Sequence, residues 1–158
     1  MKKAVCAAAA AVLLIFSMSQ SLNSARLYYT QYVTYEEDVR LAVKITDRID
    51  QLGLGETPKE PVVFVGGRTP QRNGVCLSDT DLELIGRSFF QISYSAKHGS
   101  WVMNHFLDTL GYSYVFPTDE QVAAAEEKAQ DMPVWPDEGS VALAGDVIIV
   151  KLSETASD

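Results

Sequence analysis

The sequence predicts an α/β protein: one amino-terminal transmembrane helix, followed by a small mixed α/β domain that ends in a β-hairpin. Three observations support this fold class: an uncharged apolar run near the amino terminus, helix-like and strand-like segments that alternate after it, and two valine-rich strand segments near the carboxyl end. With 158 residues, 47% of them hydrophobic, the chain can form one domain with a packed core.

The apolar run is long enough to cross a membrane. No charged residue occurs from Ala4 to Ala25, and a helix over this segment would measure about 33 Å, against a hydrocarbon layer of ~30 Å. Residues 1–25 are therefore predicted to be a transmembrane helix of the signal-anchor type. A signal peptide cleaved near Ser21 or Ala25 is the alternative, although Ser19-Gln20-Ser21 fits a cleavage site only loosely.

Basic and aromatic residues flank this segment. Lys2 and Lys3 predict a cytoplasmic amino terminus, with the rest of the chain across the membrane, because cytoplasmic flanks of membrane helices carry an excess of basic residues. Four tyrosines after the run fit either an aromatic belt at the membrane surface or the first turns of a soluble helix. They are Tyr28, Tyr29, Tyr32 and Tyr35.

Residues 26–55 are predicted to form an amphipathic connecting helix, almost continuous with the membrane helix. Apolar side chains recur there at spacings of three and four residues, which places them on one helix face. The face consists of Tyr35, Val39, Ala42, Ile45, Ile49 and Leu52. Gly53 and Gly55 are typical residues for the end of the helix.

Residues 60–153 are predicted to form the small α/β domain, and residues 154–158 a loose tail. The unbroken apolar run from Pro61 to Gly67 is typical of a buried parallel strand. The other expected elements are a helix from Asp79 or Thr80, a helix over 100–110, a strand over 112–116, a capped helix over 118–131, and a hairpin over 140–152 that turns near Gly145.

Composition and motifs argue against several kinds of site. The net charge of −8 argues against a nucleic-acid partner, because phosphate backbones are bound by clustered lysines and arginines. Cys6 and Cys76 lie in contexts too different to predict a disulfide, and His98 and His105 are not at a usual metal-ligand spacing. No metal, cofactor or catalytic residue is predicted.

Three segments carry a resemblance to a known family. They are Thr46-Asp47-Arg48-Ile49-Asp50-Gln51, then Pro61-Val62-Val63-Phe64-Val65-Gly66, and finally Met132 to Val141 ahead of the valine-rich hairpin. After a membrane helix, this order resembles the carboxy-terminal end of the type II Gtr-like family of bacterial membrane glucosyltransferases, which are linked to the modification of O-antigen or other surface polysaccharides. The stretch from Met132 to Leu152 is the most specific part.

The resemblance implies an accessory domain on the extracytoplasmic side of the bacterial inner (plasma) membrane. The family's transfer chemistry is thought to use acidic residues between earlier transmembrane helices, which this sequence lacks, so the domain is expected not to be catalytic alone. The implied partners are the lipid bilayer, other transmembrane helices, and a glycan or polyprenyl-linked sugar. An independent membrane-anchored or exported binding module is the alternative.

Five residues are candidates for ligand binding. Gly66, Gly67, Arg68 and Thr69 follow the predicted strand, and ligands of α/β sheets usually bind at the carboxyl ends of strands. Glycine amides together with Arg68 could hold a phosphate or a sugar, unless the loop is a plain turn. Trp135 could stack on a sugar ring, as could Tyr94, Trp101, Tyr112 and Tyr114, although aromatic residues are more often part of a core.

A second candidate is an acidic cluster at the start of one predicted helix. Asp79, Asp81 and Glu83 offer carboxylates for general acid and base chemistry. Helix caps and solvated charges are the more ordinary interpretation, because no histidine or nucleophile is tied to these residues by spacing.

Overall fold

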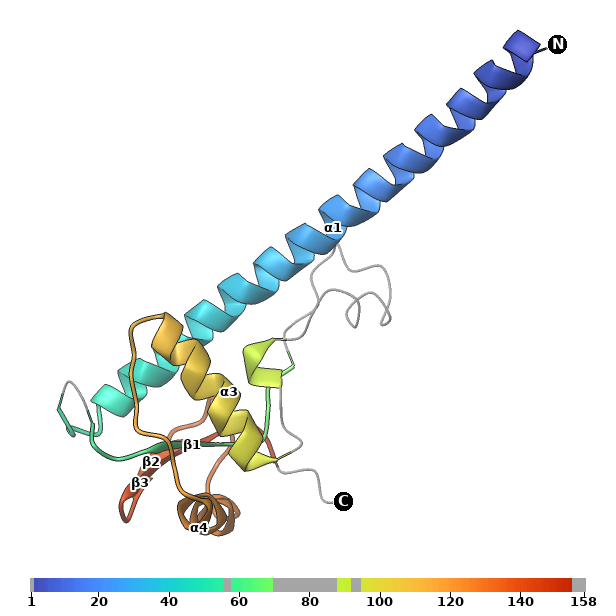
Figure 1. The fold of residues 1–158 in the computed structure, drawn as a ribbon. Coiled ribbons are helices and arrows are strands. Elements are labelled where there is room, and N and C mark those ends of the chain that lie inside the picture. Colours follow the sequence, from blue (N-terminus) through green and yellow to red (C-terminus); the bar gives the residue numbers. More distant parts are fainter. Residues whose placement is uncertain (1, 56–57, 70–87, 92–94, 155–158) are drawn as a thin grey trace. The chain divides into compact units, whose positions relative to one another are not determined.

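The computed structural model describes residues 2–55, 58–69, 88–91 and 95–154 (Figure 1). By their contacts the described residues divide into two compact units, the first comprising residues 2–34 and the second the described residues from 35 onward. The predicted fold class is confirmed, because a long amino-terminal helix precedes a small domain of helices and a three-stranded mixed sheet.

Helix α1 (Lys2–Asp50) begins in the first unit, where its apolar side chains are exposed. Every side chain from Lys3 to Tyr29 is exposed, and the five large apolar residues from Val12 to Phe16 have exposed fractions of 63 to 70%. By length and composition this part of α1 can cross a membrane, a property that amino-terminal signal sequences share. The predicted membrane helix and connecting helix are thus parts of one continuous helix.

The second half of α1 forms one wall of the core in the second unit. Ala42, Ile45 and Ile49, which lie on the predicted apolar face, have no exposed surface. Leu41 is also buried, at 5% exposed, so the buried face is wider than the predicted stripe. The ring of Tyr35 remains 44% exposed and meets the ring of Phe106 edge-on, with 6.1 Å between the ring centroids.

The sheet has the strand order β1-β3-β2, with β1 (Val62–Val65), β2 (Val141–Ala144) and β3 (Val147–Lys151). β1 pairs with β3 in parallel, as its unbroken apolar sequence predicted, and β2 pairs with β3 in antiparallel fashion, which confirms the hairpin. Gly145 has a φ of +65° in the two-residue turn between β2 and β3, a backbone conformation that favours glycine.

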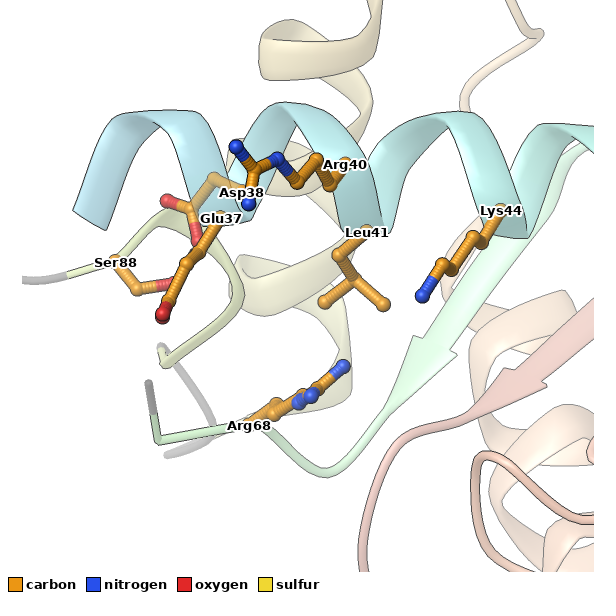
Figure 2. A pocket seen from close by; sticks show the side chains of 7 residues that line it. All are labelled: Glu37, Asp38, Arg40, Leu41, Lys44, Arg68 and Ser88. Carbon is orange, nitrogen blue, oxygen red and sulfur yellow. The ribbon is translucent and has the colours of Figure 1, made fainter. Parts of the chain in front are cut away.

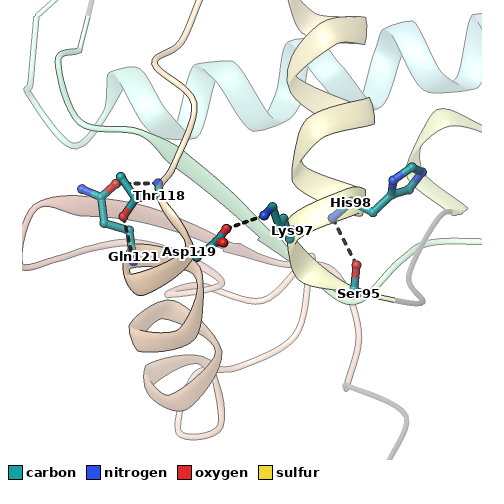
Figure 3. Close-up of polar contacts among 6 residues, drawn as sticks. All are labelled: Ser95, Lys97, His98, Thr118, Asp119 and Gln121. Atoms are coloured by element: carbon teal, nitrogen blue, oxygen red, sulfur yellow. Dashed lines mark hydrogen bonds and ion pairs between the residues drawn. The ribbon is translucent and has the colours of Figure 1, made fainter.

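Three further helices are described in the second unit, namely η1 (Phe89–Gln91), α3 (Ala96–Thr109) and α4 (Asp119–Ala129). α3 begins four residues earlier than the expected start at residue 100, because the Ser95 side chain caps it by accepting the His98 N–H at 3.2 Å (Figure 3).

The start of α4 has the predicted capping arrangement. The Thr118 side chain accepts the Gln121 N–H at 3.3 Å, and the Gln121 side chain accepts the Thr118 N–H at 3.0 Å. An ion pair of 2.6 Å between Lys97 and Asp119 joins the first turns of α3 and α4 (Figure 3). The capped helix predicted over residues 118–131 is therefore confirmed as α4.

The two faces of the sheet are covered by different helices (Figure 1). Alternate residues of a strand point to opposite faces, so Phe64 of β1 and Ile148 of β3 pack in the cluster that includes residues of α1, α3 and η1. Val63 and Ile149 point the other way and pack with residues of α4. Because both faces are covered, every residue of β1 and β3 is buried.

The predicted strand over residues 112–116 is wrong, because this segment pairs with none of the described strands. The outer edge of β1 is already occupied by side chains of α3. Ser100 Oγ accepts the Phe64 N–H at 2.8 Å, and the Asn104 side-chain amide donates to the Val62 carbonyl at 2.9 Å. These contacts satisfy the backbone groups with which another strand would pair.

Candidate functional site

Two adjoining hollows of the second unit lie between α1 and the loop that follows β1. The first, here called the Asp38 hollow, has a volume of about 170 Å³ (Figure 2). It is lined by Glu37, Asp38, Arg40, Leu41, Lys44, Arg68 and Ser88. The second, here called the Trp135 hollow, is lined by Lys44, Asp47, Arg48, Gln51, Arg68, Trp135, Pro136 and Leu152. Lys44 and Arg68 therefore line both hollows.

The Trp135 hollow contains two of the residues singled out from the sequence. Arg68 and Trp135 come from distant parts of the chain, and both line this hollow. Thr69 follows Arg68 but is not among the residues that line either hollow. The ligand-binding role of these residues stays a prediction.

The backbone of the Gly66-Gly67-Arg68 loop is engaged in contacts within the protein. Gly66 has a φ of +76°, and a Cβ at this position would lie 2.4 to 2.8 Å from atoms of Ser153. The Gly67 N–H donates to Ser153 Oγ at 3.1 Å, and the Arg68 N–H donates to the Phe90 carbonyl at 2.6 Å. Because these two amides already have acceptors, any anion bound here would depend on the Arg68 side chain.

Arg48 fixes the position of Trp135. Its guanidinium lies 4.3 Å from the centre of the Trp135 ring, a cation–π contact. The same guanidinium donates to the carbonyls of Pro136 and Asp137 at 2.5 and 2.9 Å and to Ser140 Oγ at 3.0 Å. These bonds hold the turn that carries Trp135 against α1.

The segment that carries Trp135 is also tied to β3. Lys151, at the end of β3, is 2% exposed, and its ammonium group donates to the Met132 carbonyl and pairs with Glu154, both at 2.9 Å. The Trp135 N–H donates to the Lys151 carbonyl, also at 2.9 Å. The predicted loose tail thus begins with a residue that pairs with the domain, and residues 155–158 lie outside the described part.

Lys44 and Arg68 are less firmly held by the protein than Arg48, although the charge of Arg68 acts on the nearby Asp38 carboxylate. Among the described residues, neither side chain makes a hydrogen bond or an ion pair. Figure 2 shows that both side chains project into the Asp38 hollow, Lys44 from α1 and Arg68 from the loop after β1. The two hollows together, here called the groove, therefore contain two positive side chains that make no hydrogen bond or ion pair with the described residues.

Asp38 is buried and is bonded within the protein. Its carboxylate accepts the Ser88 hydroxyl at 2.5 Å and the Phe89 N–H at 2.9 Å, which fastens α1 to η1. Burial raises the pKa of Asp38 above its usual value, and the nearby Glu37 adds to this, while the two hydrogen bonds and the charge of Arg68 act in the opposite direction. Both carboxylate oxygens are thus committed to a structural contact.

A separate aromatic surface lies on α3 and the segment that follows it. Trp101 is 54% exposed and meets the ring of His105 at 4.4 Å between centroids, and His105 in turn meets Phe116 at 5.0 Å. The other aromatic residues considered for a sugar platform are elsewhere. Tyr112, Tyr114 and Trp135 are partly buried and pack against the core cluster. Tyr94 lies outside the described residues.

Two features singled out from the sequence, the acidic cluster and the second cysteine, belong to a part of the chain that the structure does not describe. Asp79, Asp81, Glu83 and Cys76, together with the helix predicted from Asp79 or Thr80, lie outside the described residues. Within the described ranges there is no group of three or more histidine, cysteine, aspartate or glutamate side chains that could hold a metal ion.

Sequence reasoning did not identify Lys44 and Arg48 as residues of the groove. A usable signal was present, because Arg40, Lys44 and Arg48 follow one another at intervals of four and so lie along one face of a helix. That face turns toward Arg68 and Trp135, a placement that depends on the tertiary structure.

Comparison of the chain with protein-family models, with curated proteins and with solved structures gave no match. The resemblance to membrane glucosyltransferases therefore rests on the sequence motifs alone.

Proposed function

We propose that this protein is a membrane-anchored accessory domain of a glucosyltransferase that modifies a bacterial surface polysaccharide. In this proposal α1 anchors the chain in the inner membrane beside other transmembrane helices, with its amino terminus in the cytoplasm. The second unit lies on the extracytoplasmic side and docks a glycan or a polyprenyl-linked sugar for a catalytic partner, without performing the transfer itself.

The observation that carries the proposal is the meeting of Arg68 and Trp135 in one hollow. A partly exposed indole offers a flat apolar surface to the C–H groups of a sugar ring, and neighbouring cations donate hydrogen bonds to its oxygen atoms. Small-molecule sites commonly combine such an apolar surface with a few polar groups that fix the orientation of the ligand.

The membrane half of the proposal is supported by the length and composition of α1. Lys2 and Lys3 at its start favour a cytoplasmic amino terminus. A binding role is favoured over a catalytic one at this groove, since the oxygens of the buried Asp38 are bonded to Ser88 and Phe89.

The test combines two measurements on the full chain. The tagged chain is co-expressed with a membrane protein encoded just upstream of its gene and purified in detergent, and binding of the host's surface glycan is measured on the purified material. We expect the upstream protein to co-purify and the glycan to bind, with binding weakened by Trp135→Ala. If no membrane protein co-purifies and no glycan binds, the proposal is wrong.

A second candidate function is an independent binding module that is anchored in the membrane or exported. It is favoured by the position of the apolar helix at the amino terminus, where a signal sequence would pass the same test of length and composition. Mass spectrometry of the mature amino terminus distinguishes the two functions. A cut near Ser21 or Ala25 supports the exported module and excludes a retained membrane helix.

A further inference from the structure

We propose that Lys44 and Arg68 form an anion subsite in the groove and that it binds the phosphate group of a ligand. The inference deepens the proposed function and rests on it only for the sugar part of the ligand. Binding of the phosphate is argued separately, from the positive side chains that line the two hollows.

The two cations belong to separate elements and converge on the same space. Lys44 extends from α1, and Arg68 extends from the loop after β1, so that both line the Asp38 hollow and the Trp135 hollow (Figure 2). Their elements are joined by the shared core, in which Ile45 of α1 packs with Phe64 of β1. The fold therefore fixes the backbone positions from which these two exposed side chains extend.

The lining of the Trp135 hollow is positive although the whole chain is acidic. Among the described residues that line it are three cations, Lys44, Arg48 and Arg68, and one carboxylate, that of Asp47, whereas the chain carries a net charge of −8. Arg48 is committed to the turn at Pro136 and Asp137, and among the described residues no ion pair joins Asp47 to a cation of the hollow. Two like charges that lie close together and make no hydrogen bond or ion pair with the described residues favour an external anion, which would compete with the Asp38 carboxylate for the charge of Arg68.

The position of the carboxylates indicates where the anion would sit. Glu37 and Asp38 line the Asp38 hollow and would repel an anion there, whereas the Trp135 hollow lacks both of them. An anion held by Lys44 and Arg68 therefore lies toward Trp135.

The pair of side chains suits a phosphate. The planar guanidinium of Arg68 can donate two parallel hydrogen bonds to two oxygens, and the ammonium of Lys44 can act on a third as a point charge. A phosphate ester offers these oxygens, and Trp135 lies beside them to receive the ring of a sugar. The ligand class is thus a phosphate, either free or attached to a sugar.

The test uses the full chain in detergent micelles with Trp101→Phe as background, which leaves Trp135 as the single tryptophan reporter. Inorganic phosphate and a hexose 1-phosphate are titrated at constant ionic strength while the Trp135 fluorescence is recorded. Lys44→Gln and Arg68→Gln remove one cation each, and Lys44→Arg restores the charge. Lys128→Gln is the matched control, because Lys128 is an exposed cation on α4 that lines neither hollow.

We expect saturable binding that Lys44→Gln and Arg68→Gln each weaken about tenfold, the effect of losing one charge-assisted hydrogen bond. Lys44→Arg and Lys128→Gln should bind as the background protein does. Tighter binding of the hexose phosphate supports a sugar-phosphate ligand, and equal affinities support free phosphate. The subsite is excluded if phosphate gives no saturable response, or if Lys128→Gln weakens binding as much as the groove variants. Loss of phosphate binding with glycan binding intact would overturn this inference and leave the proposed function standing.

Discussion

Substitution of Gly66 by alanine tests whether packing against Ser153, which follows β3, sets the position of the Gly66-Gly67-Arg68 loop. Gly66 has a φ of +76°, and an added Cβ would lie 2.4 Å from Ser153 Oγ and 2.6 and 2.8 Å from the backbone oxygen and nitrogen of that residue. Rotation of the Ser153 side chain can relieve only the first contact. The backbone contacts require the loop or the chain after β3 to move.

The expected loss of stability has two parts. An alanine held in the left-handed region costs about 1–2 kcal/mol, and overpacking against a fixed neighbour costs about 1–3 kcal/mol. The two together predict a decrease in unfolding free energy of roughly 2–5 kcal/mol for Gly66→Ala. Gly53→Ala is a matched control, because Gly53 has nearly the same φ, +73°, but nothing within 4 Å of an added Cβ.

The measurement is urea unfolding of the full chain in detergent, followed by tryptophan fluorescence. Gly53→Ala should lose about 1–2 kcal/mol, the conformational cost alone, and Gly66→Ala should lose clearly more. Equal losses in the two variants would show that the contact with Ser153 is unimportant and that the loop before Arg68 is free to adjust.

Three further predictions concern the groove and its surroundings. Arg48→Met should lower the unfolding free energy by about 1–3 kcal/mol and shift the Trp135 fluorescence, because three hydrogen bonds and a cation–π contact are lost. The control variant Arg40→Met should change the unfolding free energy by less than ~0.5 kcal/mol. Burial raises the pKa of Asp38 in the folded chain, so its contribution to stability is present below the unfolded pKa and is lost as the pH rises through the folded one. Urea unfolding at several acidic pH values measures this loss of stability with rising pH, and Asp38→Asn should abolish the part that is due to Asp38. If the variant loses stability with pH as the original protein does, the prediction is wrong. Burial raises the pKa of Tyr114 from 10.0 to about 12, so an ultraviolet titration should show a late ionisation that is absent from Tyr114→Phe, with stability lost between these two pH values.

Most of the fold follows from local patterns in the sequence. The apolar stripe that contains Ala42, Ile45 and Ile49 predicts the buried face of α1, and the Thr118 and Gln121 pair predicts the start of α4. The apolar run at Val62 to Val65 predicts a strand buried on both faces. Each of these signals reflects interactions between residues close together in the chain or a simple contrast between buried and exposed positions.

The wrong strand at residues 112–116 shows where local patterns fail. Its alternation of tyrosines with other residues fits a strand, and Tyr112 and Tyr114 do pack against the core. Whether such a segment joins a sheet depends on a free strand edge, and Ser100 and Asn104 of α3 already bond the outer edge of β1. Occupation of an edge by a distant helix has no local signature.

The candidate site could be predicted only in part for a similar reason. The position of Arg68 after a buried strand and the aromatic character of Trp135 both attract attention in the sequence. Their placement in one hollow with Lys44 depends on how β3 and the turn at Pro136 lie against α1. These are long-range contacts between segments that no sequence spacing relates.

The strand order has a consequence for synthesis of the protein. β3 follows β1 and β2 in the chain but lies between them in the sheet, so neither of the earlier strands has its ladder partner until the last strand has left the ribosome. Until then the backbone edge of β1 that pairs with β3 has no strand beside it. A premature stop before Val147 would leave both outer strands without a neighbour, and we expect such a product to be degraded rather than to accumulate as a smaller folded domain.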